Sequence, residues 1–178
     1  RLKKFLKEKK IDGYIIPKND EFFLEYVAEE KDRLKYISNF TGSYGLALIL
    51  NTHNYLFVDG RYTLQAKIQC GKYFKIRTIP KTLPGNVLKN KNLKIGYDPS
   101  LFTKKKFRIL FNNARCKFIP ISENIVDKIW KTKKIEKRGK FYILPKSSVG
   151  QSVFTKLNKV ASFIKKNGAD FQLITSSE

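Results

Sequence analysis

Strand patterns and helix patterns alternate along residues 2–130, and this alternation restricts the fold more than any other feature of the chain. Runs of β-branched and aromatic residues bounded by Gly, Pro, Asn or Asp predict strands. These runs lie at residues 14–16, 46–50, 55–58, 74–79, 93–97 and 118–119. Apolar residues at helical spacing predict helices. They lie at residues 2–6, 33–40, from 60 onward, 104–113 and 125–130, with one or two helical turns expected at 22–26.

The order of these elements predicts the architecture. Residues 51–54 separate two expected strands and have the turn chemistry of a hairpin. Strands that alternate with helices, together with one tight hairpin, indicate a three-layer α/β domain with a mixed sheet.

The rest of the chain predicts a linker and a second unit. Residues 131–140 are dominated by charge, which is typical of a solvated linker. A helix is expected at 153–166 and a strand at 171–175, but one helix and one strand cannot bury a core. We therefore expect a domain at 1–132, a linker at 133–150 and the beginning of an incomplete second α/β domain at 151–178.

The formal net charge of +22 is the most unusual number of the composition. Nearly all of the excess is lysine spread along the chain, and Asn, Ile, Phe and Tyr are abundant as well. These residues share codons made only of A and T, so genome composition explains the whole set, whereas nucleic-acid binding explains only the lysines. We expect no specific nucleic-acid partner. A basic binding module for nucleic acid or other polyanions is the competing function.

Three features of the sequence indicate the cellular compartment and the absence of a membrane partner. No apolar run reaches the 18 or more residues of a membrane span, and the amphipathic segment Arg1–Leu6 does not have the pattern of a signal peptide. Cys70 and Cys116 show no C-x-x-C spacing, which favours free thiols in a reducing compartment. These features predict a cytoplasmic protein without a membrane partner.

Few residues have the chemistry of a catalytic centre. The only histidine, His53, falls in the expected hairpin turn, where an exposed position is favoured. Glu29, Glu30 and Asp32 are close in sequence on what should be a solvated face. Ser43, in a glycine-rich loop, has no candidate base other than His53. We therefore expect no catalytic residue and no metal site in this chain.

The segment Val58-Asp59-Gly60-Arg61-Tyr62 places a cation in the first turn of an expected helix. Asp59 follows a strand pattern and is a good helix N-cap. The positive end of the helix dipole disfavours a cation there by about 0.3–1 kcal/mol. Either Arg61 has a function outside the fold, or it is solvated or paired with a nearby carboxylate.

Several segments resemble, in order and over nearly the whole chain, the amino-terminal region of the Xaa-Pro aminopeptidases, or aminopeptidases P, of the creatinase/prolidase superfamily of pita-bread metallopeptidases. The segments are Tyr14-Ile15-Ile16-Pro17, Glu25-Tyr26-Val27-Ala28, residues 38–45 (SNFTGSYG), Asp59-Gly60-Arg61-Tyr62, Gly96-Tyr97-Asp98-Pro99, residues 123–130 (ENIVDKIW) and residues 173–178 (LITSSE).

The resemblance implies a ribonuclease-H-like domain of a hydrolase that removes the first residue from peptides with proline second. It implies two divalent metal ions, taken to be manganese, held in a carboxy-terminal domain that is absent from this chain, and a homodimer. Within the chain it implies one substrate-binding residue, Arg61. Three features depart from the family pattern: Tyr44 stands where a small residue is usual, Arg-Pro is missing after Trp130, and the charge is higher.

Overall fold

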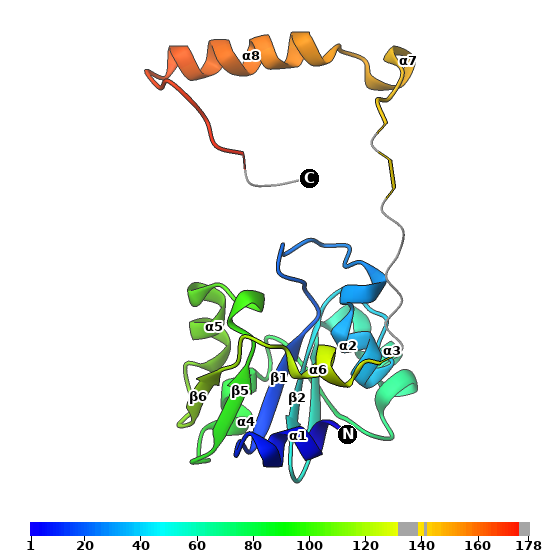
Figure 1. Ribbon diagram of the computed structural model, residues 1–178, viewed down its shortest axis with the longest axis vertical. Helices are drawn as coiled ribbons and strands as arrows, with labels where there is room; N and C mark the ends of the chain where they lie inside the picture. Colours follow the sequence, from blue (N-terminus) through cyan, green and yellow to red (C-terminus); the bar gives the residue numbers. More distant parts are fainter. Residues whose placement is uncertain (132–138, 141, 175–178) are drawn as a thin grey trace. The chain divides into compact units, whose positions relative to one another are not determined.

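The computed structural model describes residues 1–131, 139–140 and 142–174 (Figure 1). The chain divides into unit 1, Arg1–Glu136, and unit 2, Lys137–Glu178. The strands of unit 1 are β1 (Gly13–Pro17), β2 (Gly45–Leu50), β3 (Asn54–Val58), β4 (Lys75–Thr78), β5 (Lys94–Tyr97) and β6 (Lys117–Pro120). Its helices are α1 (Leu2–Glu8), α2 (Arg33–Ser38), α3 (Thr63–Cys70), α4 (Pro84–Leu88), α5 (Lys104–Phe111) and α6 (Ile125–Ile129), and its 3-10 turns are η1 (Glu29–Lys31), η2 (Gly60–Tyr62) and η3 (Pro99–Leu101).

The strands form one sheet in the order β4-β3-β2-β1-β5-β6. Only β2 runs antiparallel to its neighbours, with Gly13 opposite Leu50 and Gly45 opposite Val58. The other neighbouring pairs are parallel. Consequently the carboxyl ends of five strands meet at one edge of the sheet, which we name the carboxyl edge.

Helices cover both faces of this sheet (Figure 1). One buried cluster contains residues of α1, α2, α3 and α6, and the other contains residues of α4 and α5. Along β1, Tyr14 and Ile16 belong to the first cluster and Ile15 to the second, as the two-residue period of a strand requires. Because β1 is buried on both faces, its sequence is continuously apolar. The predicted three-layer α/β fold with a mixed sheet is confirmed.

The helical turns expected at residues 22–26 are wrong. The Asp20 carboxylate accepts hydrogen bonds from the backbone N–H groups of Phe22 and Leu24, at 3.0 and 3.4 Å, and builds a side-chain-capped turn. Phe23 has a φ of 59°, in the left-handed region, where a helix cannot continue. Helix α4 was not expected, since its five residues, which include Pro84 and Gly85, are too short to show a helical period.

Unit 2 contains two helices in its described residues, α7 (Lys146–Val149) and α8 (Val153–Lys166). The predicted helix at 153–166 is confirmed, and Ser152 caps it by accepting the N–H of Thr155. The strand expected at 171–175 does not form at 171–174, because no strand of the described part of unit 2 is there to pair with it; Thr175 lies outside the described residues.

The domain boundary at 132 and part of the linker also fall outside the description, so that division stays a prediction. Helix α7 lies within the expected linker. No helix in the described ranges combines the length and the apolar character that crossing a membrane requires.

Candidate functional site at the carboxyl edge

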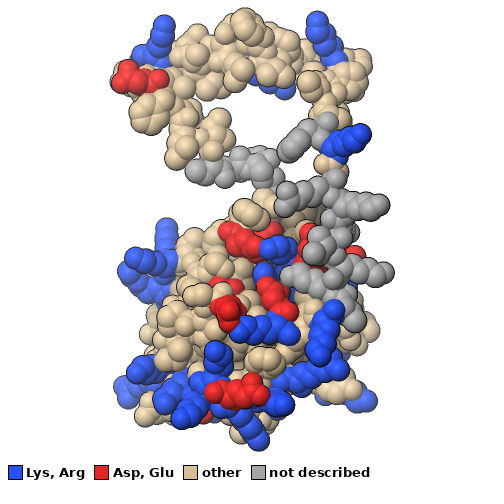
Figure 2. Space-filling model, in the orientation of Figure 1, with Lys and Arg blue, Asp and Glu red and all other residues tan. Residues whose placement is uncertain are grey.

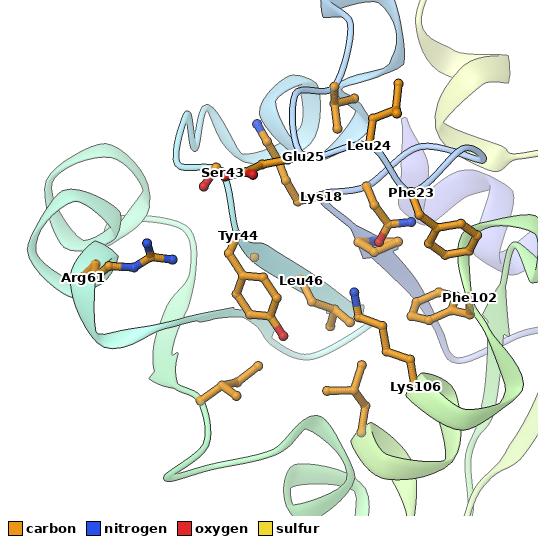
Figure 3. Close-up of a pocket in the computed structure, with 16 residues that line it drawn as sticks. Lys18, Phe23, Leu24, Glu25, Ser43, Tyr44, Leu46, Arg61, Phe102 and Lys106 are labelled. Carbon is orange, nitrogen blue, oxygen red and sulfur yellow. The ribbon is translucent and has the colours of Figure 1, made fainter. Parts of the chain in front are cut away.

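A cavity of about 260 Å³ lies at the carboxyl edge of the sheet (Figure 3). The segments that follow β1, β3 and β4 line it, together with residues of α5. Ligands of open α/β sheets bind outside the carboxyl ends of the strands, because loops from neighbouring strands converge there. The charged and phenolic side chains on its lining are Lys18, Glu25, Tyr44, Arg61 and Lys106.

Arg61 lies in η2, directly after β3, and lines the cavity with a side chain that is 75% exposed. The Asp59 carboxylate caps the turn by accepting the backbone N–H of Arg61 at 2.9 Å. The same carboxylate accepts Nε at 3.2 Å and Nη2 at 2.7 Å from the Arg61 guanidinium. Asp59 is the expected N-cap, and it also neutralises the cation that the helix dipole disfavours. Pairing with a nearby carboxylate, which the sequence left open, is therefore present.

This pairing changes the acidity of both groups. The hydrogen bond from the Arg61 side chain lowers the pKa of Asp59 below its usual value, and the bond to Asp59 raises the pKa of Arg61. The guanidinium also lies 5.3 Å from the centre of the Tyr62 ring. Because Asp59 neutralises the guanidinium, the unfavourable helix dipole is by itself no longer a sign of function for Arg61. Its exposed position beside a cavity nevertheless leaves the guanidinium accessible.

Lys18 directs its amine away from solvent toward Asp32. Its Nζ lies 2.6 Å from Asp32 Oδ2, and both side chains are largely buried. Asp32 also caps α2 by accepting the N–H of Lys35 at 3.0 Å. The expectation that Asp32 lies on a solvated face is wrong, because a capping carboxylate with a buried lysine partner is held inside the fold.

Tyr44 and Lys106 lie close to one another on the cavity lining. The Lys106 Nζ lies 5.7 Å from the centre of the Tyr44 ring. Burial lowers the pKa of Lys106 and raises the pKa of Tyr44, to which the Asp59 charge adds. Tyr44, the departure from the family pattern, therefore lines the cavity.

Of the remaining candidates, Ser43 lines the cavity, whereas His53, Cys70 and Cys116 do not. His53 is exposed in the hairpin, as predicted. The Ser43 hydroxyl lies 2.8 Å from the Tyr62 hydroxyl. Cys70 and Cys116 are free thiols, the first buried and the second half-buried. Across residues 1–131, 139–140 and 142–174, no group of three or more His, Cys, Asp or Glu side chains is placed to hold a metal ion.

Sequence reasoning missed Lys106. It belongs to a run of three lysines, Lys104-Lys105-Lys106, and composition alone does not distinguish one of them from the others. The available signal was the helical spacing of Lys106 and the buried Leu110, four residues apart, which puts them on one side of α5.

Lysine and arginine side chains are scattered over the face drawn in Figure 2, most of them on unit 1, with acidic side chains among them. In the described part of the chain the cavity lining has three aromatic residues, Phe23, Tyr44 and Phe102, so this site offers no long row of stacking rings of the kind that platforms for single-stranded nucleic acid use. The fold and the cavity define a small α/β domain with a site where loops converge, lined by a few charged groups and by apolar side chains.

Comparison with known proteins identifies the family of this domain. The family model described as the creatinase/prolidase N-terminal domain matches residues 1–129, and the chain belongs to this family. A probable Xaa-Pro aminopeptidase P of Coprinopsis cinerea is 29% identical over 190 aligned positions, which cover 98% of this chain and 30% of that protein. A protein of the same name from Fusarium vanettenii is 31% identical, covering 93% of this chain and 28% of that protein.

Solved structures show the same fold. The X-prolyl aminopeptidase of Caenorhabditis elegans, described as a cytosolic enzyme with a di-nuclear active site, has a TM-score of 0.72 and 24% identity over 90% of this chain and 28% of its own. The N-terminal domain of a cytoplasmic peptidase from Mycobacterium tuberculosis has a TM-score of 0.56 and 19% identity, and is covered to 94%. The chain thus spans about 30% of the length of the curated relatives it matches.

Proposed function

We propose that this chain is the amino-terminal, non-catalytic part of an Xaa-Pro aminopeptidase, which removes the first residue from peptides with proline second. The support is similarity to proteins of that name over 98% of the chain. The observation that carries a role for this part is the ordered Asp59-Gly60-Arg61 turn, which lines a cavity at the carboxyl edge. Its work is to shape the entrance to the active site, to select short peptides and to contribute to a homodimer.

The catalytic ligands belong to another part of the parent protein in this proposal. The described residues do not fit a metal centre, since no suitable group of ligands is present among them. Two divalent ions, taken to be manganese, would bind in a catalytic domain and lower the pKa of bound water. We place the parent protein in the cytoplasm, where the Caenorhabditis elegans relative is described.

Arg61 is the residue that we assign to substrate binding. Exposed ion pairs contribute about 0–1 kcal/mol, so the guanidinium can leave Asp59 at little cost. A charge-assisted contact to a peptide carbonyl or carboxylate is worth about 1.5–3 kcal/mol. Exchange of the first partner for the second is therefore favourable when a peptide is bound.

The test uses the full-length parent enzyme and a Xaa-Pro-Pro tripeptide. Arg61→Ala should lower kcat/KM by roughly ten- to a hundredfold, at about 1.4 kcal/mol per decade. Arg115→Ala is the matched control, because Arg115 is exposed beside the start of β6, at the amino edge of the sheet. Equal kcat/KM for the two variants would show that Arg61 does not contact substrate.

A further inference from the structure

The three cations on the cavity lining differ in their partners. Arg61 pairs with Asp59, and Lys18 pairs with Asp32. Lys106 forms no ion pair with any carboxylate of the described residues. Glu25, the acidic residue of the lining, acts electrostatically on Arg61. The ammonium of Lys106 is thus the cation of this cavity that has no anion.

An ammonium in this position is poorly compensated. Burial disfavours its charged form and lowers its pKa, and no carboxylate of the described residues pairs with it to offset the loss. The face of the Tyr44 ring attracts the cation at 5.7 Å, and the ammonium donates to no protein acceptor among the described residues, so its three N–H donors are open to a ligand. Figure 3 shows the Lys106 amine and the Tyr44 ring turned into the same part of the cavity. Tyr44 also carries a phenol hydroxyl, which is a further hydrogen-bond donor on the cavity lining.

The remaining lining of the cavity is mostly apolar. Leu46, Ile79, Phe102 and Leu110 contribute side chains to it. Its volume of about 260 Å³ lies below the about 300–1,000 Å³ typical of sites for drug-sized ligands. The cavity therefore suits one amino-acid residue with an apolar side chain and a single negative charge.

We propose that this cavity binds the free C-terminal carboxylate of a short peptide, through the ammonium of Lys106 and the hydroxyl of Tyr44, and holds the side chain of the last residue on its apolar lining. The choice of a peptide rests on the proposed function; the carboxylate follows from the position of Lys106. The site would favour short peptides, since the carboxylate must reach the cavity while the other end of the peptide is at the catalytic centre.

The first experiment measures binding by the 178-residue chain itself. The probes are N-acetyl-L-leucine and N-acetyl-L-leucinamide, which differ only in the terminal group, a charged carboxylate in the first and a neutral amide in the second, and the readout is titration calorimetry. The acid should bind at least about tenfold more tightly than the amide, as one charge-assisted contact predicts. Lys106→Gln should abolish this preference. Lys104→Gln, an exposed neighbour on the same helix, should retain it.

Three results would overturn the assignment: equal binding of acid and amide, no binding of either, or a preference that persists in Lys106→Gln. Binding of inorganic phosphate as tight as that of N-acetyl-L-leucine would also overturn it, since the site would then recognise anions in general. Thermal unfolding of each variant separates loss of binding from loss of folding.

The second experiment separates this inference from the proposed function. In the full-length enzyme, Lys106→Gln should lower kcat/KM for a Xaa-Pro-Leu tripeptide by about tenfold and leave kcat/KM for its C-terminal amide unchanged. An enzyme that cleaves acid and amide equally well with either residue at 106 refutes the carboxylate site alone. An enzyme that cleaves no Xaa-Pro peptide refutes the proposed function. The calorimetric experiment still tests carboxylate binding in that case, because it does not depend on peptide cleavage.

Discussion

Asp127→Asn should destabilise unit 1 strongly, because Asp127 holds a buried arginine. The Arg33 side chain is 5% exposed. Its Nε donates to both carboxylate oxygens of Asp127 at 3.1 Å, and its Nη2 donates to Oδ2 at 2.8 Å. The second carboxylate near Arg33 is Glu21, 3.5 Å from Nη1. Burial alone would lower the pKa of Arg33, but the bonds and charge of Asp127 raise it.

The magnitude follows from burial on each side of the pair. Removing one partner of a buried ion pair costs about 3–5 kcal/mol, since an unpaired charge remains inside the protein. Asp127 is 31% exposed, so water can replace part of its contact, and Glu21 remains. We therefore expect a loss of about 2 kcal/mol. For a unit of this size, this corresponds to a decrease in Tm of about 8 °C.

The assay is thermal unfolding followed by the fluorescence of Trp130, the only tryptophan. Its ring stacks on Tyr36 of α2 at 4.6 Å, so its emission reports the contact between the segment that ends α6 and the rest of unit 1. Glu29→Gln is the control, because Glu29 is 68% exposed and its pairing with Lys35 is a surface contact. The control should change Tm by little.

A double variant tests the reason for the loss. Arg33→Met combined with Asp127→Asn removes the buried cation that the single variant leaves unpaired, and apolar replacements of buried pairs are often neutral. Glu21 keeps its ion pair with Lys31 in that variant. The double variant should therefore unfold at a higher temperature than Asp127→Asn. If it is no more stable, or if Asp127→Asn alone leaves Tm unchanged, the ion pair does not hold α6 in place.

Two further predictions concern stability. Burial alone would raise the pKa of Glu21, but its ion pairs lower it. The stability that Glu21 contributes to the folded state is therefore complete above its unfolded pKa of about 4.3, and it is lost as pH falls through its folded pKa. The Tm measured by calorimetry should fall below about pH 4, and less steeply in Glu21→Gln; an equal slope would contradict this. Gly13→Ala would place a Cβ 2.7 Å from the Ile49 carbonyl oxygen and should cost about 1–3 kcal/mol in chemical denaturation, whereas Gly60→Ala, with no atom within 4 Å, should cost nothing comparable. Equal midpoints for both glycine variants would refute the steric argument.

The sequence predicted those parts of the fold whose cause is local. The alternation of Tyr14, Ile15 and Ile16 between two cores follows from the two-residue period of a strand. Asp59 was identifiable as an N-cap because it stands between a strand pattern and a helix pattern. At residues 22–26 the local rule failed, since the Asp20 side chain offers the backbone a turn that competes with the helix.

Contacts between distant residues were beyond reach of the sequence. Arg33 and Asp127 are 94 positions apart, and neither charge differs in sequence from its exposed neighbours. The resemblance marked residues 123–130 as characteristic, but the structure supplies the physical reason: Asp127 binds Arg33, and Trp130 stacks on Tyr36. The partner of Arg61 was two residues away, yet the sequence allowed solvation as well.

The topology explains why the candidate site is composite. Strands β1, β3 and β4 point in one direction, and β2, which lies between β1 and β3, points in the other. The segments that follow β1, β3 and β4 therefore emerge at the same edge of the sheet. Arg61 arrives there from the end of β3, while Lys106 arrives from the beginning of α5. The two cations differ in how they would meet a ligand. Arg61 is exposed and can exchange Asp59 for a ligand, whereas Lys106 is half-buried, and a bound carboxylate would be its first anionic partner. A peptide that contacts both would therefore be positioned mainly by Lys106, and Arg61 would adapt to it.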